Sequence, residues 1–223
     1  DIHEQGSMYE CSETFLVDGA HAVNTHTTTQ INTTSSGITW DLQTMNGITL
    51  DTSVSPDFNN TVAYPVGAEF QGAQTHMMMV MNTDRNVGQH ATLTITFPNP
   101  VKNPTIYFGN LKSSPGIGRR SVYYELINVG VNMDVVYTDG DFYVADNRIG
   151  TSFNNTSTRG TGLVRFNGVF NALTFTLGHF SNVNEDGVIR TNLNLGYYDC
   201  VDTGFSSNAD TDNDGIVNSL DLD

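Results

Sequence analysis

The sequence is short of basic residues and has no long apolar run, and each shortage excludes a class of protein. Lys and Arg together number 9, against 24 Asp and Glu, which gives a formal net charge of −15. A field of this sign repels nucleic-acid phosphates and anionic lipid head groups, so we expect no nucleic-acid partner. Because no run of about 18 apolar residues occurs, we also expect no membrane insertion.

Strong helix formers are scarce as well. Charged residues make up 15% of the chain, whereas Asn, Thr, Ser and Gly, which favour strands and turns, are abundant. No segment keeps the apolar period of a helix with a cap at each end, so we expect almost no α-helix. The 38% of hydrophobic residues is still enough to close a core, which argues against disorder. This composition is typical of an exported, extracellular β-protein.

Short strand-like segments separated by turn residues run along the chain. Alternation is clearest at 91–97 and 172–178, where every second residue is apolar. We expect strands at 14–17, 37–42, 47–52, 76–81, 91–97, 105–110, 121–128, 133–137, 163–166, 172–178 and 191–198. Many short strands with frequent turns predict an all-β fold, an antiparallel two-sheet β-sandwich of the jelly-roll or lectin-like kind.

Dipeptides of the kind that tight turns prefer separate several of these segments. In a two-residue hairpin loop of the commonest type both central residues have positive φ, which Asn, Asp and Gly adopt most readily. We therefore expect hairpin turns at Asn46-Gly47, Asp139-Gly140, Asn167-Gly168 and Asp186-Gly187.

The chain has two cysteines, and their positions frame the expected strands. Cys11 precedes the first strand-like segment and Cys200 follows the last. A disulfide between them would close almost the whole domain into one loop, worth roughly 4 to 5 kcal/mol in chain-entropy terms. The alternative is two buried free thiols, because a bridge requires the two Cα atoms to lie within about 7 Å.

The segment from Asp210 to Asp223 has the spacing of a calcium-binding loop, with Gly215 at its sharp turn. The expected oxygen ligands are Asp210, Asp212, Asp214, the backbone carbonyl of Ile216, Asn218 and Asp221. Carboxylates this close repel one another unless a cation lies among them. We therefore expect calcium as a cofactor, and the alternative is a solvated acidic tail.

This loop departs from an EF-hand, which would have Glu at the twelfth position and a helix on each side, whereas here Asp221 stands there and no helix precedes the loop. The pattern instead resembles one thrombospondin type 3 repeat. That resemblance implies calcium ions that rigidify acidic loops serving as spacers in extracellular proteins. We expect an appended or disordered segment at 1–8, a β-sandwich domain at 9–204 and this tail at 205–223.

The main domain has a strand, a proline-bounded crossing and a strand at 93–108, then strand-rich sequence at 164–177 and a closing strand at 186–198. This succession resembles the lectin-like β-sandwich modules of large bacterial cell-surface adhesins. The resemblance implies a sandwich fold and a module, secreted or attached to the cell surface, that binds a glycan or another surface ligand. None of the family's ligand-binding residues can be carried over to a position here.

Ligand contacts are expected among aromatic and polar side chains near loops, because sugars place apolar faces on rings and hydroxyls on polar groups. The candidates are Arg119, Arg120 and Tyr124. The arginine pair, beside a glycine-rich loop, would hold a carboxylate or sulfate of an acidic polysaccharide. The alternatives are a solvated turn and a core tyrosine. A second cation site within 139–147 competes with a plain hairpin turn.

Catalysis is not expected. Glu69 and Glu125 are the only glutamates between Glu13 and Glu185, and the sequence has no nucleophile elbow, phosphate loop, zinc signature or dinucleotide fingerprint. The leading hypothesis is a binding module with a polysaccharide or cell-surface ligand as partner. Two alternatives stay open: a self-associating subunit of a calcium-stabilised surface stalk or filament, and a carbohydrate-active jelly-roll enzyme.

Overall fold

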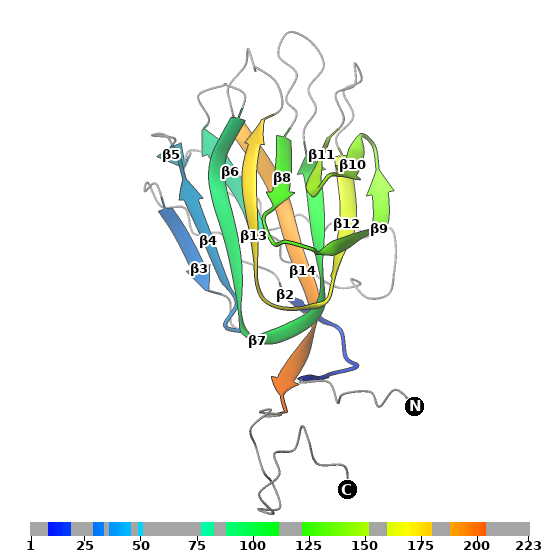
Figure 1. Cartoon of the computed structure of the whole chain (residues 1–223). Coiled ribbons are helices and arrows are strands. Elements are labelled where there is room, and N and C mark those ends of the chain that lie inside the picture. Colours follow the sequence, from blue (N-terminus) through cyan, green and yellow to red (C-terminus); the bar gives the residue numbers. More distant parts are fainter. Residues whose placement is uncertain are drawn as a thin grey trace, which may run out of the picture.

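All regular secondary structure in the described part of the chain is β-strand. The computed structural model describes residues 9–18, 29–33, 36–45, 49–50, 77–82, 88–111, 122–151, 160–179 and 188–203. Among these residues there is no helix that could span a membrane. The expected all-β fold is confirmed, as Figure 1 shows.

All the strands of the described residues belong to one connected sheet, and every pairing between them is antiparallel. In chain order they are β1 (Tyr9–Cys11), β2 (Leu16–Asp18), β3 (Thr29–Thr33), β4 (Thr39–Thr44), β5 (Thr49–Leu50), β6 (Met77–Asn82), β7 (Gly88–Leu111), β8 (Val122–Leu126), β9 (Asn132–Asp139), β10 (Phe142–Ala145), β11 (Arg148–Thr151), β12 (Gly160–Asn167), β13 (Val169–His179) and β14 (Val188–Asp202). The sequence does not predict β1, β3, β10 or β11.

The long strand β7 belongs to two rows of strands. Its first half pairs with β4 and β13, and its second half pairs with β14 and β12. The first row runs β3-β4-β7-β13-β8-β11-β10. The second row runs β5-β6-β14-β7-β12-β9. Figure 1 shows β7 bending at the lower end of the view as it passes from one row to the other.

The bend in β7 lies in a proline-rich stretch. Pro98, Pro100 and Pro104 have no backbone N–H for a sheet ladder, and the registers with β13 and β14 shift there. Asn103 has a φ of +49° and its N–H donates to the Gly168 carbonyl over 2.8 Å. Its side-chain oxygen accepts from the Gly168 N–H over 3.0 Å. The crossing expected between two strands is therefore a bend within one.

Side chains from both rows form the main hydrophobic core. The rings of Phe108 and Tyr124 lie 5.2 Å apart between centroids, and those of Phe166 and Phe175 lie 5.6 Å apart. Each pair joins a strand of the second row to a strand of the first. In 91–97 the apolar side chains are buried and the threonines between them are more exposed, which confirms the alternation. Burying each large side chain contributes about 1.5 to 3 kcal/mol.

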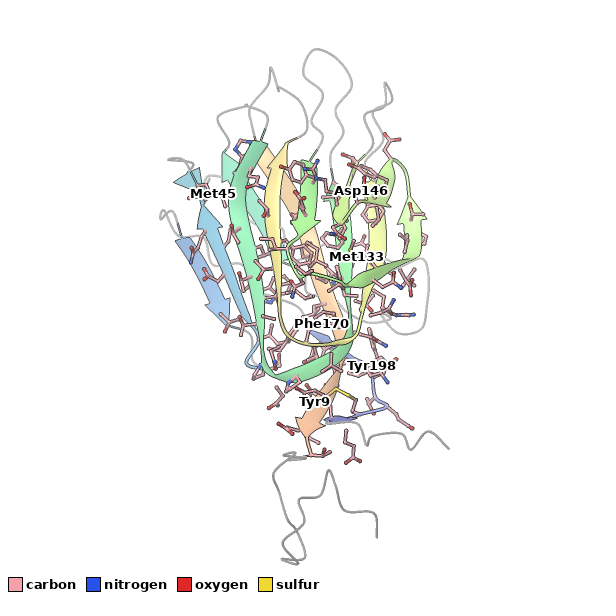
Figure 2. All side chains as sticks on the ribbon, viewed as in Figure 1. Tyr9, Met45, Met133, Asp146, Phe170 and Tyr198 are labelled. Atoms are coloured by element: carbon pink, nitrogen blue, oxygen red, sulfur yellow. A yellow bond between two sulfur atoms is a disulfide. The ribbon has the colours of Figure 1, made fainter. Side chains whose placement is uncertain are left out.

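The predicted disulfide is confirmed. Cys11 on β1 lies directly opposite Cys200 on β14, and the two sulfur atoms are bonded. Figure 2 shows this bond in yellow near Tyr9. The cross-link spans 189 positions of sequence and ties the first strand of the described chain to the last.

Two of the four turn dipeptides do not form the hairpins that the sequence predicts. Asp139-Gly140 leads from β9 in the second row to β10 in the first, and Asn167-Gly168 leads from β12 to β13 in the same way. The expectation of hairpins is wrong at these two points, because the strands that the turns connect are not paired with each other. Asn46-Gly47 and Asp186-Gly187 lie outside the described residues.

A two-residue hairpin forms instead between β10 and β11. Ala145 pairs with Arg148, and the loop residues Asp146 and Asn147 have φ of +49° and +62°. Positive φ at both positions is the geometry that matches the twist of paired strands, and Asp and Asn tolerate it well. This turn joins the ends of β10 and β11, which form part of the candidate site.

All described strands lie between Tyr9 and Asp202. The expected N-terminal segment at 1–8 and tail at 205–223 lie outside the described residues, so the three-part division of the chain stays a prediction.

Candidate ligand-binding site

Most of the predicted site residues lie outside the part of the chain that the structure describes. This holds for the arginine pair Arg119 and Arg120 and for the calcium-loop residues Asp210, Asp212, Asp214, Ile216, Asn218 and Asp221. Both sites stay predictions. Among the described residues no three His, Cys, Asp or Glu side chains gather as metal ligands would.

Tyr124 is a core residue, which corrects its interpretation as a ligand contact. Its side chain is 0% exposed, and its ring lies 5.2 Å from that of Phe108 and 6.4 Å from that of Phe175. A side chain without exposed surface offers nothing to a ligand outside. Four further aromatic residues are buried too: Trp40, Tyr107, Tyr123 and Tyr197.

The described residues form an open depression over β8, β10 and β11, at the edge of the first row. Its volume is about 330 Å³, and it is lined by Glu125, Tyr143, Ala145, Asp146 and Arg148. In the sheet register Arg148 lies between Glu125 on β8 and Ala145 on β10. Because alternate residues of a strand share a face, Tyr143 lies on the same face as Ala145. Figure 2 places Asp146 at the opposite end of the molecule from Tyr9.

Arg148 is held by two groups on β8. Its Nε lies 3.3 Å from Oε2 of Glu125, and both side chains are partly exposed, at 39% and 30%. Its guanidinium carbon lies 4.7 Å from the ring centroid of Tyr123. A cation over a ring face gains about 0.5 to 1 kcal/mol at an exposed site, and a surface ion pair gains a similar amount. The two contacts therefore fix a direction for the guanidinium more than they stabilise the fold.

The tyrosines beside Arg148 stay neutral. Burial raises the pKa of Tyr143 to about 12, and the nearby Arg148 charge offsets part of that rise. Burial likewise raises the pKa of Tyr123, with Arg148 lowering it and Glu125 raising it by smaller amounts. Tyr143 is half-buried and lines the depression, whereas Tyr123 is 4% exposed and supports Arg148 from below. The depression thus offers one accessible, uncharged aromatic ring.

Gly178 on β13 makes room for the Tyr123 ring. A Cβ atom at this position would clash with the backbone carbonyl oxygen of Gly88, and it would lie 2.6 Å from the Tyr123 hydroxyl oxygen and 2.8 Å from its Cζ. Such contacts are shorter than real Cβ atoms make, so only glycine lets the ring lie where it meets Arg148. A residue on β13, the strand next to β8, therefore leaves room for the ring that contacts the guanidinium.

Chemically, this arrangement suits binding. A ring, two carboxylates and a guanidinium can contact both the apolar face and the hydroxyls of a polar ligand. Asp146 and Asn147 form the β10–β11 turn, whereas the hairpin expected at Asp139-Gly140 is not formed. Glu125 is ion-paired to Arg148, and Glu69, the other mid-domain glutamate, lies outside the described residues.

Neither Tyr143 nor Arg148 is among the site residues that the sequence predicts. The available signal was Asp146-Asn147, a dipeptide fit for a two-residue turn, with four residues on either side that can form strands. Reading it as a hairpin would have predicted β10 and β11. The neighbour on the other side, β8, would still have been missing, because strand order is a tertiary property.

Comparison of the chain with models of known protein families finds no match. Neither curated proteins nor solved structures give a match either.

Proposed function

We propose that this chain is an extracellular adhesion module that binds a glycan in the depression formed by β8, β10 and β11. The observation that carries the proposal is the joint lining of this depression by the Tyr143 ring, the Glu125–Arg148 ion pair and the exposed Asp146. Aromatic rings stack against the apolar faces of sugars, and carboxylates and guanidinium groups hydrogen-bond to hydroxyls. A volume of about 330 Å³ is at the small end for ligand sites, so it suits a short saccharide.

The fold supports an adhesin-like module. The two rows of strands share β7, and rings from one row contact rings from the other, as expected for the layers of a lectin-like jelly-roll sandwich. We propose that architecture for the domain. The resemblance at 93–108, 164–177 and 186–198 to bacterial surface adhesins points the same way.

The chemistry of the cross-link supports the extracellular location that we propose. Structural disulfides persist in oxidising compartments, and Cys11–Cys200 is of this kind. The acidic loop from Asp210 to Asp221, similar to a thrombospondin type 3 repeat, adds a calcium-binding spacer to the proposal.

A stalk or filament subunit is the second candidate, because one edge strand carries exposed apolar side chains. Among the described residues β9 pairs only with β12, and Val135 and Val136 are 46% and 37% exposed. Such an edge can add a strand from another chain, although the bulge at these residues weakens it. Sedimentation of the chain with and without calcium tests this second candidate. Reversible, calcium-dependent assembly would support the filament, and a chain that stays monomeric at high concentration would contradict it.

The glycan-binding proposal is tested by screening immobilised oligosaccharides and titrating each ligand found against the unchanged chain and three variants. We expect Tyr143→Ala to weaken binding at least tenfold, because it removes the stacking face. Ala145→Gln should weaken it too by filling the depression from an exposed position that the core does not use. Tyr9→Ala, at the other end of the molecule, is the matched control and should bind as the unchanged chain does. Equal binding by all variants would place the site elsewhere.

A further inference from the structure

The charges of the depression are unbalanced. Its lining holds two carboxylates, Glu125 and Asp146, and one guanidinium, Arg148. The chain around it carries 24 acidic and 9 basic residues, so the long-range field has the same sign as the local excess. An anionic ligand therefore meets repulsion both on approach and in contact, while a neutral ligand meets neither.

Arg148 does not reverse this balance. A guanidinium that serves as an anion clamp presents its donors to the ligand. Here the Nε of Arg148 is engaged by Glu125 at 3.3 Å, and the guanidinium lies over Tyr123 at 4.7 Å. An acidic ligand would have to compete with Glu125 for the guanidinium while lying beside the exposed carboxylate of Asp146. The Glu125–Arg148 ion pair is better suited to a sugar hydroxyl, which can donate a hydrogen bond to Glu125 and accept one from Arg148.

The aromatic part of the site carries no charge. Tyr143 is half-buried and lines the depression beside Ala145, whose small side chain leaves space above the strand. A pyranose ring stacks through its C–H groups, and this contact needs no charge on the ligand. Neutral stacking and hydroxyl contacts are thus both available, and nothing in the lining favours an acidic group.

We infer that the depression selects glycans without acidic groups, namely neutral or amino sugars, and rejects uronic acids and sulfated sugars. This inference rests on the proposed glycan-binding function and narrows it. It also separates the depression from the arginine pair at Arg119 and Arg120, for which an acidic polysaccharide is expected.

The test uses matched oligosaccharides that differ only at C6, where one series carries a hydroxyl and the other a carboxylate. Glucose, galactose and mannose backbones supply three such pairs, and the full-length chain is titrated with each at low and high salt. We expect every backbone that binds to do so roughly tenfold more tightly in its neutral form, a difference of about 1.4 kcal/mol. Salt should reduce the difference by screening the repulsion.

Glu125→Gln separates local from global charge. It removes the carboxylate that engages Arg148, so we expect the acidic series to gain and the tenfold difference to shrink to about twofold. Glu10→Gln, on β1 at the other end of the molecule, removes one acidic residue equally and should leave the difference unchanged. Each variant's melting temperature verifies its fold, and the ion pair contributes little stability because it is exposed.

The outcomes are distinguishable. Acidic oligosaccharides that bind as tightly as their neutral partners, and lose that binding in Tyr143→Ala, would overturn the inference and leave glycan binding intact. The absence of any binding to either series or to the wider oligosaccharide screen would overturn the proposed function itself. Neutral selectivity that responds to Glu125→Gln and not to Glu10→Gln supports both.

Discussion

Arg148 takes its position from Tyr123 and Glu125, which lie two residues apart on β8 and so share one face of the sheet. The sequence contains this relation, because alternation along a strand is a local property. It does not contain the pairing of β8 with β11, which brings Arg148 to that face. The residue types of the site could therefore be recognised from the sequence. The strand pairing that brings them into contact could not.

Tyr124 and Tyr123 illustrate the same limit. Adjacent residues of a strand point to opposite faces, so the sequence predicts that one of the two is core, without saying which. The structure places Tyr124 against Phe108 and Phe175 and Tyr123 against Arg148. Only the layer beneath β8 decides between them, and that layer comes from strands distant in sequence.

Tyr143 gives a prediction for alkaline pH. Because its pKa is raised from 10.0 to about 12, the folded chain keeps the phenolic proton that the unfolded chain loses, and stability falls as pH rises from about 10 to about 12. A spectrophotometric titration of phenolate should show a late transition that disappears in Tyr143→Phe. If Tyr143→Phe removes a transition near pH 10 instead, the ring is not buried as described.

At the scale of elements, the sequence predicts the strands that alternate and misses β1, β3, β10 and β11. The segments at 91–97 and 172–178 have one apolar face and emerge as parts of β7 and β13. The strands β10 and β11 have four residues each, too few to establish a period. The turn dipeptides do not identify hairpins, because a residue with positive φ occurs in a turn between the two rows as well as in a hairpin.

The β1–β14 cross-link gives a prediction for stability. Replacing both Cys11 and Cys200 by Ser should lower the free energy of unfolding by roughly 4 to 5 kcal/mol, because the unfolded chain regains the freedom of a loop that spans nearly the whole domain. Urea unfolding measures the change, with the exposed Ser12→Ala beside the bridge as control. A loss below about 1 kcal/mol would mean that β1 contributes little to holding β14.

At the scale of the whole molecule, the acidic balance and the C-terminal loop predict a calcium requirement. Titration calorimetry of the full chain should detect calcium binding, and the pair Asp212→Asn and Asp214→Asn should abolish it by removing two expected ligands. Asp202→Asn, an exposed acidic residue on β14, is the matched control. Unchanged binding in the double variant would assign the calcium to other residues.

For the whole molecule, composition predicts the fold class and the disulfide but not the path of β7. Abundant Asn, Thr, Ser and Gly indicate an all-β fold, and the two framing cysteines indicate a disulfide that closes it; both are confirmed. The path of β7 through both rows depends on three prolines and on Asn103 binding Gly168, a contact across 65 positions of sequence. Contacts of that range have no signature in a single sequence.

We propose that a glycan binds over β8, β10 and β11. The most direct measurement is the change in backbone amide resonances of the full chain as a neutral oligosaccharide from the screen is added. We expect the largest shifts at Tyr123–Leu126 and Tyr143–Gly150, and we expect them to vanish in Tyr143→Ala. Shifts concentrated on β9, or on any segment outside the depression, with these residues unmoved, would contradict it.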